Sequence, residues 1–306
     1  MLDRQLVEDV AFRLNTDAAL VEKDWHVVRA LGVISALDHQ DIVPAFSGGT
    51  SLSKGWQLIK RFSEDIDFKL AMPASESRSK DRTRRKAYRS RTLAALSAAG
   101  FEPVGEVLKG NEDRFFSANF MFRGLFETVR GLRPHIRIEM TFDETALPPV
   151  ARPIQSLIGQ AQNIAPEISS FLCVDPIETA ADKLSALAWR VCTRERGAED
   201  DDPTIIRHLH DLAALASYVS SSEAFANLVQ QAALNDTGRG GGKVPNDATS
   251  RFVMMFERLR GESFWSDDYS EYVRAVSYAK PDETLSFNDA LDALTTLMRG
   301  FDLSAK

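Results

Sequence analysis

Hydrophobic and polar positions along the chain predict helices and strands in its first half and helices in its second half. Helical spacing of apolar residues covers positions 2–14 and 18–37, and Asp17 is a suitable N-cap for the second helix. Short apolar runs predict strands at residues 42–46, 62–70, 101–108, 115–122 and 135–142. These elements indicate an α/β (α+β) domain with a small mixed sheet.

The second half predicts a different kind of domain. Residues 147–163 contain Pro148, Pro149 and Pro153 and are interpreted as a link, followed by a short strand at 171–174. Helical periodicity then predicts helices at residues 177–194, 203–218, 222–234, 247–260, 267–280 and 287–301. The expected domains are therefore residues 1–165, with the sheet, and residues 166–306, mainly helical. The glycine-rich residues 235–246 are interpreted as a connector.

Residues 44–70, PAFSGGTSLSKGWQLIKRFSEDIDFKL, contain the main candidate chemistry. Asp65 and Asp67 are two residues apart on one predicted strand, so both carboxylates project from the same face. They repel each other, and a hard divalent cation with phosphate oxygens would relieve that repulsion. The preceding turn and helix start supply candidate phosphate ligands: Ser47, Gly48, Gly49, Thr50, Ser51 and Lys54. The alternative is an ordinary β-turn followed by a solvated strand.

The order of these motifs resembles the nucleotidyltransferase superfamily of the DNA polymerase β type. More narrowly, the chain resembles the AbiEii/AbiGii toxin family, which includes the mycobacterial MenT toxins. The resemblance covers about residues 21–215 and rests on Glu22-Lys23-Asp24, FSGGTSLSK into RFSEDIDF, ETAADKLSALAWR and RHLHDL. It implies a polymerase-β-like domain that transfers NMP from an NTP, with Mg²⁺ (or Mn²⁺), to an RNA acceptor such as the 3′ end of tRNA. It also implies a nearby gene for a DNA-binding antitoxin.

The resemblance also assigns roles to residues. Asp65 and Asp67 would hold metal, and a third acid on a later strand would assist them. Glu139 is the candidate, with Asp143 and Glu144 as competitors; the alternative for Glu139 is an ion pair with Arg137 or Arg130.

In the second half, Lys183 would contact the nucleotide phosphates and Asp211 would join it. Both would face Asp65 and Asp67 across a cleft between the domains. His208 and His210 depart from the family pattern in this helix, and an i,i+4 pair between Arg207 and Asp211 is the alternative. Glu22, Lys23 and Asp24 are interpreted as charge in a first helical turn.

Charge distribution adds a candidate RNA contact. The chain has 306 residues, 44% apolar and 26% charged, with a net charge of −7. This charge argues against a protein that coats nucleic acid indiscriminately. Residues 78–91 nevertheless contain eight basic residues and one acid. Their mutual repulsion suggests a nearby anion, so an RNA-binding role is expected for Arg82, Arg84, Arg85, Lys86 and Arg89; the alternative is a solvated helix face.

Composition also limits the compartment. The chain has two cysteines without metal-ligand spacing, no long uncharged apolar stretch and no signal-peptide core at its start, which favours a reduced cytoplasm and no membrane partner. Two rival functions remain: a nucleotidyltransferase with a small-molecule acceptor, and a non-catalytic nucleotide- or RNA-binding protein of the same fold.

Overall fold

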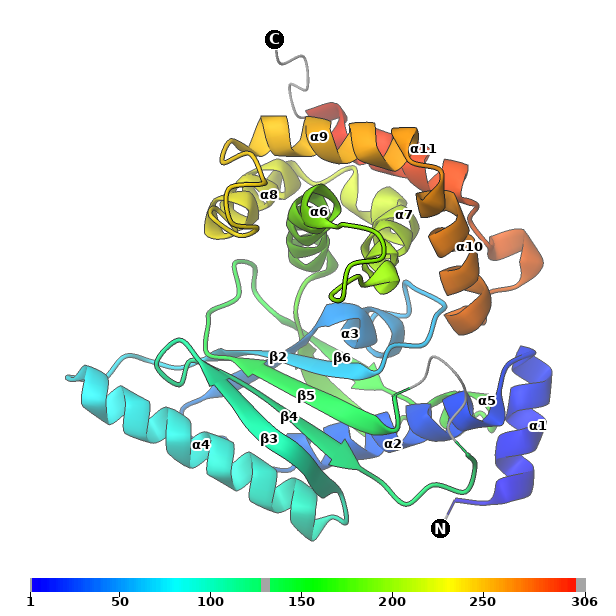
Figure 1. Ribbon diagram of the computed structural model, residues 1–306. Coiled ribbons are helices and arrows are strands. Elements are labelled where there is room, and N and C mark those ends of the chain that lie inside the picture. Colours follow the sequence, from blue (N-terminus) through cyan, green and yellow to red (C-terminus); the bar gives the residue numbers. More distant parts are fainter. Residues whose placement is uncertain (1, 128–132, 301–306) are drawn as a thin grey trace. The chain divides into compact units, whose positions relative to one another are not determined.

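A mixed β-sheet organises the first part of the chain in the computed structural model, which describes residues 2–127 and 133–300. Within these residues, seven strands follow the order β3-β4-β5-β2-β1-β7-β6, and Figure 1 shows β3, β4, β5 and β2 side by side. The pairs β2–β5 and β1–β7 are parallel and the others are antiparallel. The strands are β1 (Val43–Ser47), β2 (Asp65–Ala71), β3 (Glu102–Gly110), β4 (Phe115–Met121), β5 (His135–Thr141), β6 (Val150–Ile154) and β7 (Ile168–Cys173). The predicted α/β class with a mixed sheet is confirmed.

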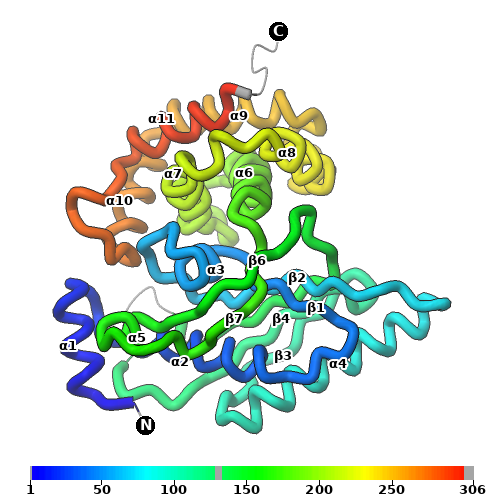
Figure 2. Tube along the Cα trace, turned by 180° about the vertical axis from the view of Figure 1, so that it is seen from behind, coloured from blue at the N-terminus to red at the C-terminus, as the bar shows by residue number. Residues whose placement is uncertain are grey.

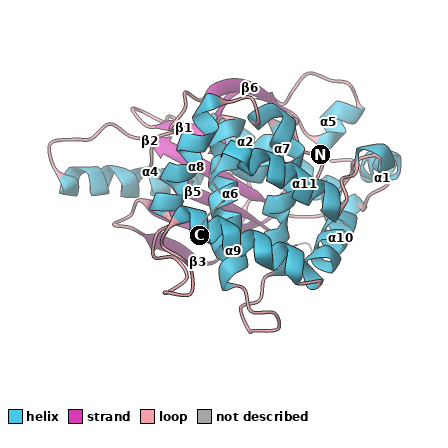
Figure 3. Cartoon of the chain, turned by 90° about the horizontal axis from the view of Figure 1, so that it is seen from above, coloured by secondary structure: helices cyan, strands magenta, loops and turns pink. Residues whose placement is uncertain are grey.

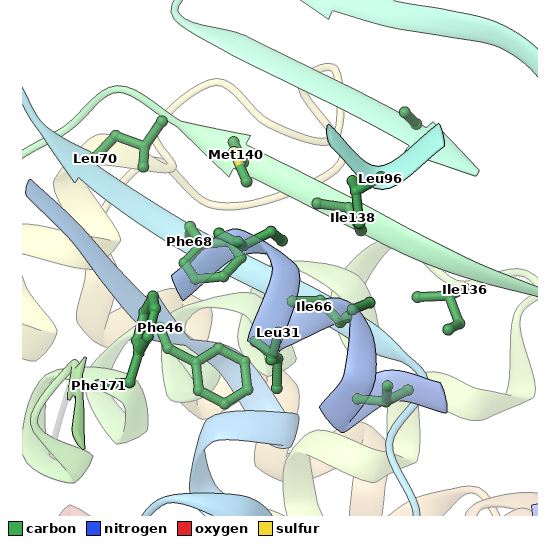
Figure 4. Packing of buried hydrophobic residues seen from close by; sticks show 14 of the residues in the cluster. Leu31, Phe46, Ile66, Phe68, Leu70, Leu96, Ile136, Ile138, Met140 and Phe171 are labelled. Atoms are coloured by element: carbon green, nitrogen blue, oxygen red, sulfur yellow. The ribbon is translucent and has the colours of Figure 1, made fainter. Parts of the chain in front are cut away.

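The two faces of the sheet differ because side chains alternate along each strand. In β2, Ile66, Phe68 and Leu70 are buried and alternate with half-buried polar residues, and β5 follows the same pattern. Figure 4 shows Leu31 and Leu96 among the apolar side chains of the central strands. The apolar face therefore forms the core, and the opposite face presents the acids.

Helices of the first part pack on this core or connect its strands. Leu31 belongs to α2 and Leu96 to α4, so both helices cover the apolar face. The side chain of Asp17 accepts a hydrogen bond from the Ala19 N–H, which confirms its predicted capping role. The helices are α1 (Arg4–Leu14), α2 (Ala18–Ser35), α3 (Gly48–Lys54), α4 (Arg78–Ala98) and α5 (Leu157–Ala161).

The predicted link at residues 147–163 is wrong, because this segment contains β6 and α5. β6 lies at the edge of the sheet beside β7 (Figure 2). Pro153 lacks an N–H, and the pairing register shifts between Arg152 and Ile154 around it. An edge strand tolerates a proline because only one of its sides needs ladder hydrogen bonds.

The chain divides into two compact units, Met1–Asp175 and Pro176–Lys306. The expected boundary at residue 165 falls before β7, which pairs with β1 and belongs to the sheet. The second unit is helical, and α6 contacts α7, α8 and α9 within it (Figure 3). Its α-helices are α6 (Pro176–Thr193), α7 (Arg207–Val219), α8 (Glu223–Asn235), α9 (Ala248–Gly261), α10 (Phe264–Val276) and α11 (Phe287–Leu297). Three short 3₁₀ segments, Pro203–Ile206, Pro281–Glu283 and Met298–Gly300, complete the described elements.

Both cysteines are buried free thiols, and burial raises the pKa of Cys173 and of Cys192 to about 11. In the described part of the chain, no helix is both long and apolar enough to cross a membrane.

Phe68→Ala should lower the free energy of unfolding of the first unit by about 3–5 kcal/mol, because it opens a cavity in the core. The Phe68 ring is 2% exposed and lies 5.7 Å from the ring centroids of both Phe46 and Phe171. Urea unfolding followed by circular dichroism measures the loss. Phe12→Ala is the control, because Phe12 is 89% exposed in the same unit and its replacement should change stability by less than about 0.5 kcal/mol. Equal losses in the two variants would contradict the placement of the core.

Candidate functional site

The turn between β1 and α3 brings main chain against the carboxylate of Asp67. β1 ends at Ser47, and Gly48 has φ +73°, a conformation that favours glycine. A Cβ at Gly48 would lie 2.1 Å from Asp67 Oδ2, so any side chain there would overlap the carboxylate. Of the two predicted aspartates, Asp67 is therefore the one whose carboxylate lies against Gly48.

Strand register sets further polar residues beside Asp67. Ser47 pairs with Asp67, Asp67 pairs with Glu139, and Glu139 pairs with Ser117. Residues paired in register project from the same face of a sheet. These four side chains, which we call the acid row, therefore cross four neighbouring strands. Ser117 Oγ donates a hydrogen bond of 3.2 Å to Glu139 Oε1.

The competitors of Glu139 lie elsewhere. Asp143 and Glu144 follow the end of β5 and are exposed. Asp143 Oδ1 accepts a hydrogen bond of 3.0 Å from the Glu144 N–H. Of the two alternative ion pairs named for Glu139, the one with Arg137 is formed: Arg137 Nη1 lies 3.8 Å from Glu139 Oε1. Arg130, the other named partner, lies outside the described residues.

Asp65 lies two residues before Asp67 on the same face, and an arginine holds it. Arg133 Nη1 and Nη2 lie 2.9 and 3.3 Å from the two carboxylate oxygens of Asp65. In the described ranges, no three His, Cys, Asp or Glu side chains come close enough together to hold a metal ion. Asp67 and Glu139 nevertheless supply neighbouring carboxylate oxygens, which are ligands that hard divalent cations prefer. At Asp65, the guanidinium of Arg133 already supplies a positive charge beside the carboxylate.

The other turn residues proposed for phosphate binding are mostly turned inward. Thr50 and Ser51 are buried, and the Thr50 hydroxyl donates a hydrogen bond to the Asp65 carbonyl. Lys54 is buried and forms an ion pair with Asp24. A Cβ at Gly49 would lie 2.6 Å from an Arg61 guanidinium nitrogen, so Gly49 also permits a close approach. Of the six candidates, Ser47 and Gly48 are the two that lie directly beside Asp67.

The interpretation of Glu22, Lys23 and Asp24 as first-turn charge is wrong, because all three side chains are buried. Glu22 accepts hydrogen bonds of 2.6 and 3.1 Å from two main-chain N–H groups of the segment that follows β4, at Leu125 and Phe126. Burial lowers the pKa of Lys23, although the neighbouring Glu64 carboxylate opposes this shift.

These three charges hold the segments around the acid row. Lys23 forms an ion pair with Glu64, the residue before β2. Asp24 accepts a hydrogen bond of 2.7 Å from the Leu157 N–H and pairs with Lys54 at the end of α3. Three consecutive charges in a largely apolar helix were the available sequence signal. The partners could not be predicted because they lie far away in the sequence.

The basic residues of helix α4 form ion pairs with acids of the same chain. Arg82 and Arg89 donate hydrogen bonds of 2.6 and 2.7 Å to the carboxylate of Asp113, and these bonds lower its pKa to about 2. Arg84 pairs with Asp41 and Asp81, and the buried Arg85 donates to the Glu112 carbonyl. Lys86 is exposed. Intramolecular acids therefore offset much of the repulsion among these cations, and the RNA-binding role stays a prediction.

In the second unit, α6 and α7 bring Lys183 and Asp211 together. Lys183 Nζ lies 2.7 Å from Asp211 Oδ2, and both side chains are buried. The alternative surface pair is not formed, because Arg207 donates to the Thr204 hydroxyl at 2.6 Å and lies 3.6 Å from Asp202. His210 Nδ1 lies 3.4 Å from Asp211 Oδ1, and burial lowers the pKa of His208 well below its usual value. His208 and His210, the two residues that differ from the family pattern, therefore lie next to the Lys183–Asp211 ion pair.

The first unit sets acids in register beside a Gly-Gly turn, the second unit contains a buried lysine–aspartate pair, and the family comparison assigns the chain to the nucleotidyltransferases. The chain belongs to the AbiEii family: the family model described as "Nucleotidyl transferase AbiEii toxin, Type IV TA system" matches residues 30–294. The chain is therefore a nucleotidyltransferase toxin of a type IV toxin–antitoxin system, for which the family implies an NTP donor and an antitoxin partner.

One solved structure similar to the chain is MenT4, a nucleotidyltransferase toxin from Mycobacterium tuberculosis H37Rv. The alignment covers 97% of this chain and 99% of that chain, with 18% identity and a TM-score of 0.46. No curated protein sequence matches the chain.

Gly48→Ala should lower the free energy of unfolding by about 2 kcal/mol or more, because alanine is strained at positive φ and its Cβ overlaps Asp67. Gly32→Ala is the matched control, because nothing lies within 4 Å of its built Cβ in the interior of α2. That substitution should raise stability by up to about 1 kcal/mol. Chemical unfolding of both variants measures the two effects, and the same sign for both would contradict the close approach of Asp67 to the turn.

Proposed function

We propose that this toxin transfers NMP from an NTP to the 3′ end of an RNA, with tRNA as the acceptor and Mg²⁺ (or Mn²⁺) as the metal. The single observation that supports it best is the register that sets Glu139 beside Asp67 and Asp67 beside the Gly48 turn. Family membership supports the class of reaction. A neighbouring gene for a DNA-binding antitoxin belongs to the same proposal.

Asp67 and Glu139, which pair in register, would hold the metal, and Asp65 would join them once its carboxylate is released from Arg133. When bound, divalent ions in such a site activate the attacking hydroxyl and neutralise the leaving pyrophosphate. The protein positions these acids through the sheet, since β2 carries the two aspartates and β5 carries Glu139. Glu139 is the residue that would accept the proton of the acceptor hydroxyl, because its carboxylate is fixed by Ser117.

The remaining candidate residues would bind the triphosphate or neutralise its charge. Because Gly48 has no side chain, the main chain there can approach a phosphate group bound beside Asp67. Ser47 adds a hydroxyl in the same acid row. Lys183 would neutralise charge that develops on the leaving phosphates. Its ion pair with the buried Asp211 fixes the direction of the ammonium group. Asp211 thereby acts on the reaction through Lys183.

Asp67→Asn should reduce NMP transfer by at least about 100-fold, because it removes one charge from the acid row while keeping the side-chain shape. Labelled NTPs, purified tRNA and Mg²⁺ or Mn²⁺ provide the assay. Lys183→Ala should cause a comparable loss. Asp143→Asn, an exposed acid beyond β5, is the control and should keep full activity. Transfer that persists in Asp67→Asn, or that never occurs in the unmodified protein under any NTP and metal, would overturn the proposal in favour of a binding protein.

A small-molecule acceptor is the second candidate, and the internal pairing of α4 favours it. Arg84, Arg85 and Arg89 are all engaged by acids or carbonyls of the first unit, which leaves fewer cations for RNA. The RNA proposal relies on the charges of α4 that remain accessible. The side chain of Arg82 is 55% exposed although it is paired, and Lys86 is also exposed.

Combining Arg82→Gln with Lys86→Gln separates these two candidates. For an RNA acceptor, kcat/KM for tRNA should fall about tenfold, and its salt dependence should become shallower, because phosphate contacts are lost. The KM for the NTP should not change. Lys109→Gln, which removes one positive charge from the edge strand β3, is the control and should leave the kinetics with tRNA unchanged. Unchanged kinetics with tRNA in the double variant would favour the small-molecule acceptor.

A further inference from the structure

Arg133 lies two residues before β5 and binds the carboxylate of Asp65 with both terminal nitrogens. The distances are 2.9 Å from Nη1 to Oδ1 and 3.3 Å from Nη2 to Oδ2. Two parallel hydrogen bonds of this kind engage both oxygens of a carboxylate at once. A divalent ion needs the same oxygens, and its charge repels a guanidinium held beside them. Arg133 and a metal ion therefore compete for Asp65.

The main chain of Arg133 is held independently of its side chain. Its N–H donates a hydrogen bond of 3.0 Å to Glu64 Oε2, and its carbonyl accepts one of 2.6 Å from Lys23 Nζ. Lys23 and Glu64 also pair with each other. The side chain can therefore leave Asp65 by rotation about its own bonds while the main chain stays in place.

A second acid lies within reach of the guanidinium. Arg133 Nε is 3.8 Å from Glu64 Oε2, which is within ion-pair distance. The side chain of Arg133 is 38% exposed, and that of Asp65 is 27% exposed. Both members of the ion pair are therefore partly exposed to solvent. After leaving Asp65, the Arg133 guanidinium keeps Glu64 as an anionic neighbour, and it can also bind a phosphate.

We propose that Arg133 is the counter-cation of Asp65 that the metal must displace, and that the triphosphate then becomes its new partner. This inference rests on the proposed function. Before the substrates bind, the guanidinium neutralises Asp65 and weakens metal binding. An incoming triphosphate attracts the guanidinium, since planar guanidinium groups bind phosphate oxygens with two hydrogen bonds. Nucleotide binding and metal binding therefore strengthen each other through the movement of one side chain.

Mn²⁺ binding without nucleotide tests this role directly. Electron paramagnetic resonance measures free Mn²⁺ in a titration of the full chain. Arg133→Gln should bind Mn²⁺ about five- to tenfold more tightly than the unmodified protein, because the competing cation is gone. A non-hydrolysable NTP analogue should strengthen Mn²⁺ binding in the unmodified protein more than in Arg133→Gln. A purely structural role of Arg133 predicts weaker metal binding in the variant.

Arg137→Gln is the matched control. Arg137 pairs in register with Asp65 and carries the same charge on the same face, but its guanidinium lies near Glu139 and Asn119. Its replacement should raise Mn²⁺ affinity less than that of Arg133, because its single 3.8 Å approach to Glu139 is weaker than the two hydrogen bonds from Arg133 to Asp65. In an Asp65→Asn background, Arg133→Gln should give no further gain. Circular dichroism and urea unfolding confirm that each variant is folded.

Two results would overturn the inference: equal or weaker Mn²⁺ binding in Arg133→Gln, or the same gain in Arg137→Gln. These results are distinct from a failure of the proposed function. If the unmodified protein transfers no NMP but Arg133→Gln binds Mn²⁺ more tightly, the metal competition stands and the reaction is wrong. If transfer occurs and Mn²⁺ affinity does not depend on Arg133, the reaction stands and the competition is wrong.

Discussion

The pairing of three buried charges on α2 is the constraint on which the candidate site depends. Glu22, Lys23 and Asp24 lie inside the first unit, where an unpaired charge would cost several kcal/mol. Each finds partners on a different segment: main-chain amides after β4, Glu64 before β2, and Lys54 at the end of α3. A single helical turn thereby fixes three connections around the sheet. Because the charges cannot be left unpaired, these connections cannot move independently of the helix.

The same constraint explains why the glycine turn can be so tight. α3 is held at its start by the Thr50 hydroxyl on the Asp65 carbonyl and at its end by Lys54 on Asp24. Two residues before the first of these anchors, Gly48 approaches Asp67 at a distance that excludes any Cβ. A turn without anchors could relieve that crowding by shifting outward. The anchored turn keeps the carboxylate and main chain together, which preorganises the site and reduces the rearrangement needed during reaction.

Local patterns predicted the parts of the site that depend on strand alternation, and missed those that depend on distant partners. The shared face of Asp65 and Asp67 and the inward–outward alternation around Glu139 follow from a period of two. Most predicted strands and helices overlap observed ones, but β6 and α5 were missed because the prolines were interpreted as a link, and α10 spans Phe264–Val276 rather than residues 267–280. The burial of Lys54 depends instead on Asp24, thirty residues earlier, and that of Arg85 on main chain after β3. No window of sequence contains such pairs.

Charge balance on the polar face follows from the same geometry. The register that sets Glu139 next to Asp67 brings two carboxylates together, which is unfavourable without a nearby cation. The face offsets this repulsion with arginines: Arg137 is paired in register with Asp65, and Arg133 holds the Asp65 carboxylate. Arg137 belongs to β5 and is fixed by the sheet, whereas Arg133 precedes the strand and only its main chain is anchored. A sheet that must assemble several acids before its substrates arrive therefore benefits from one fixed cation and one that can be displaced.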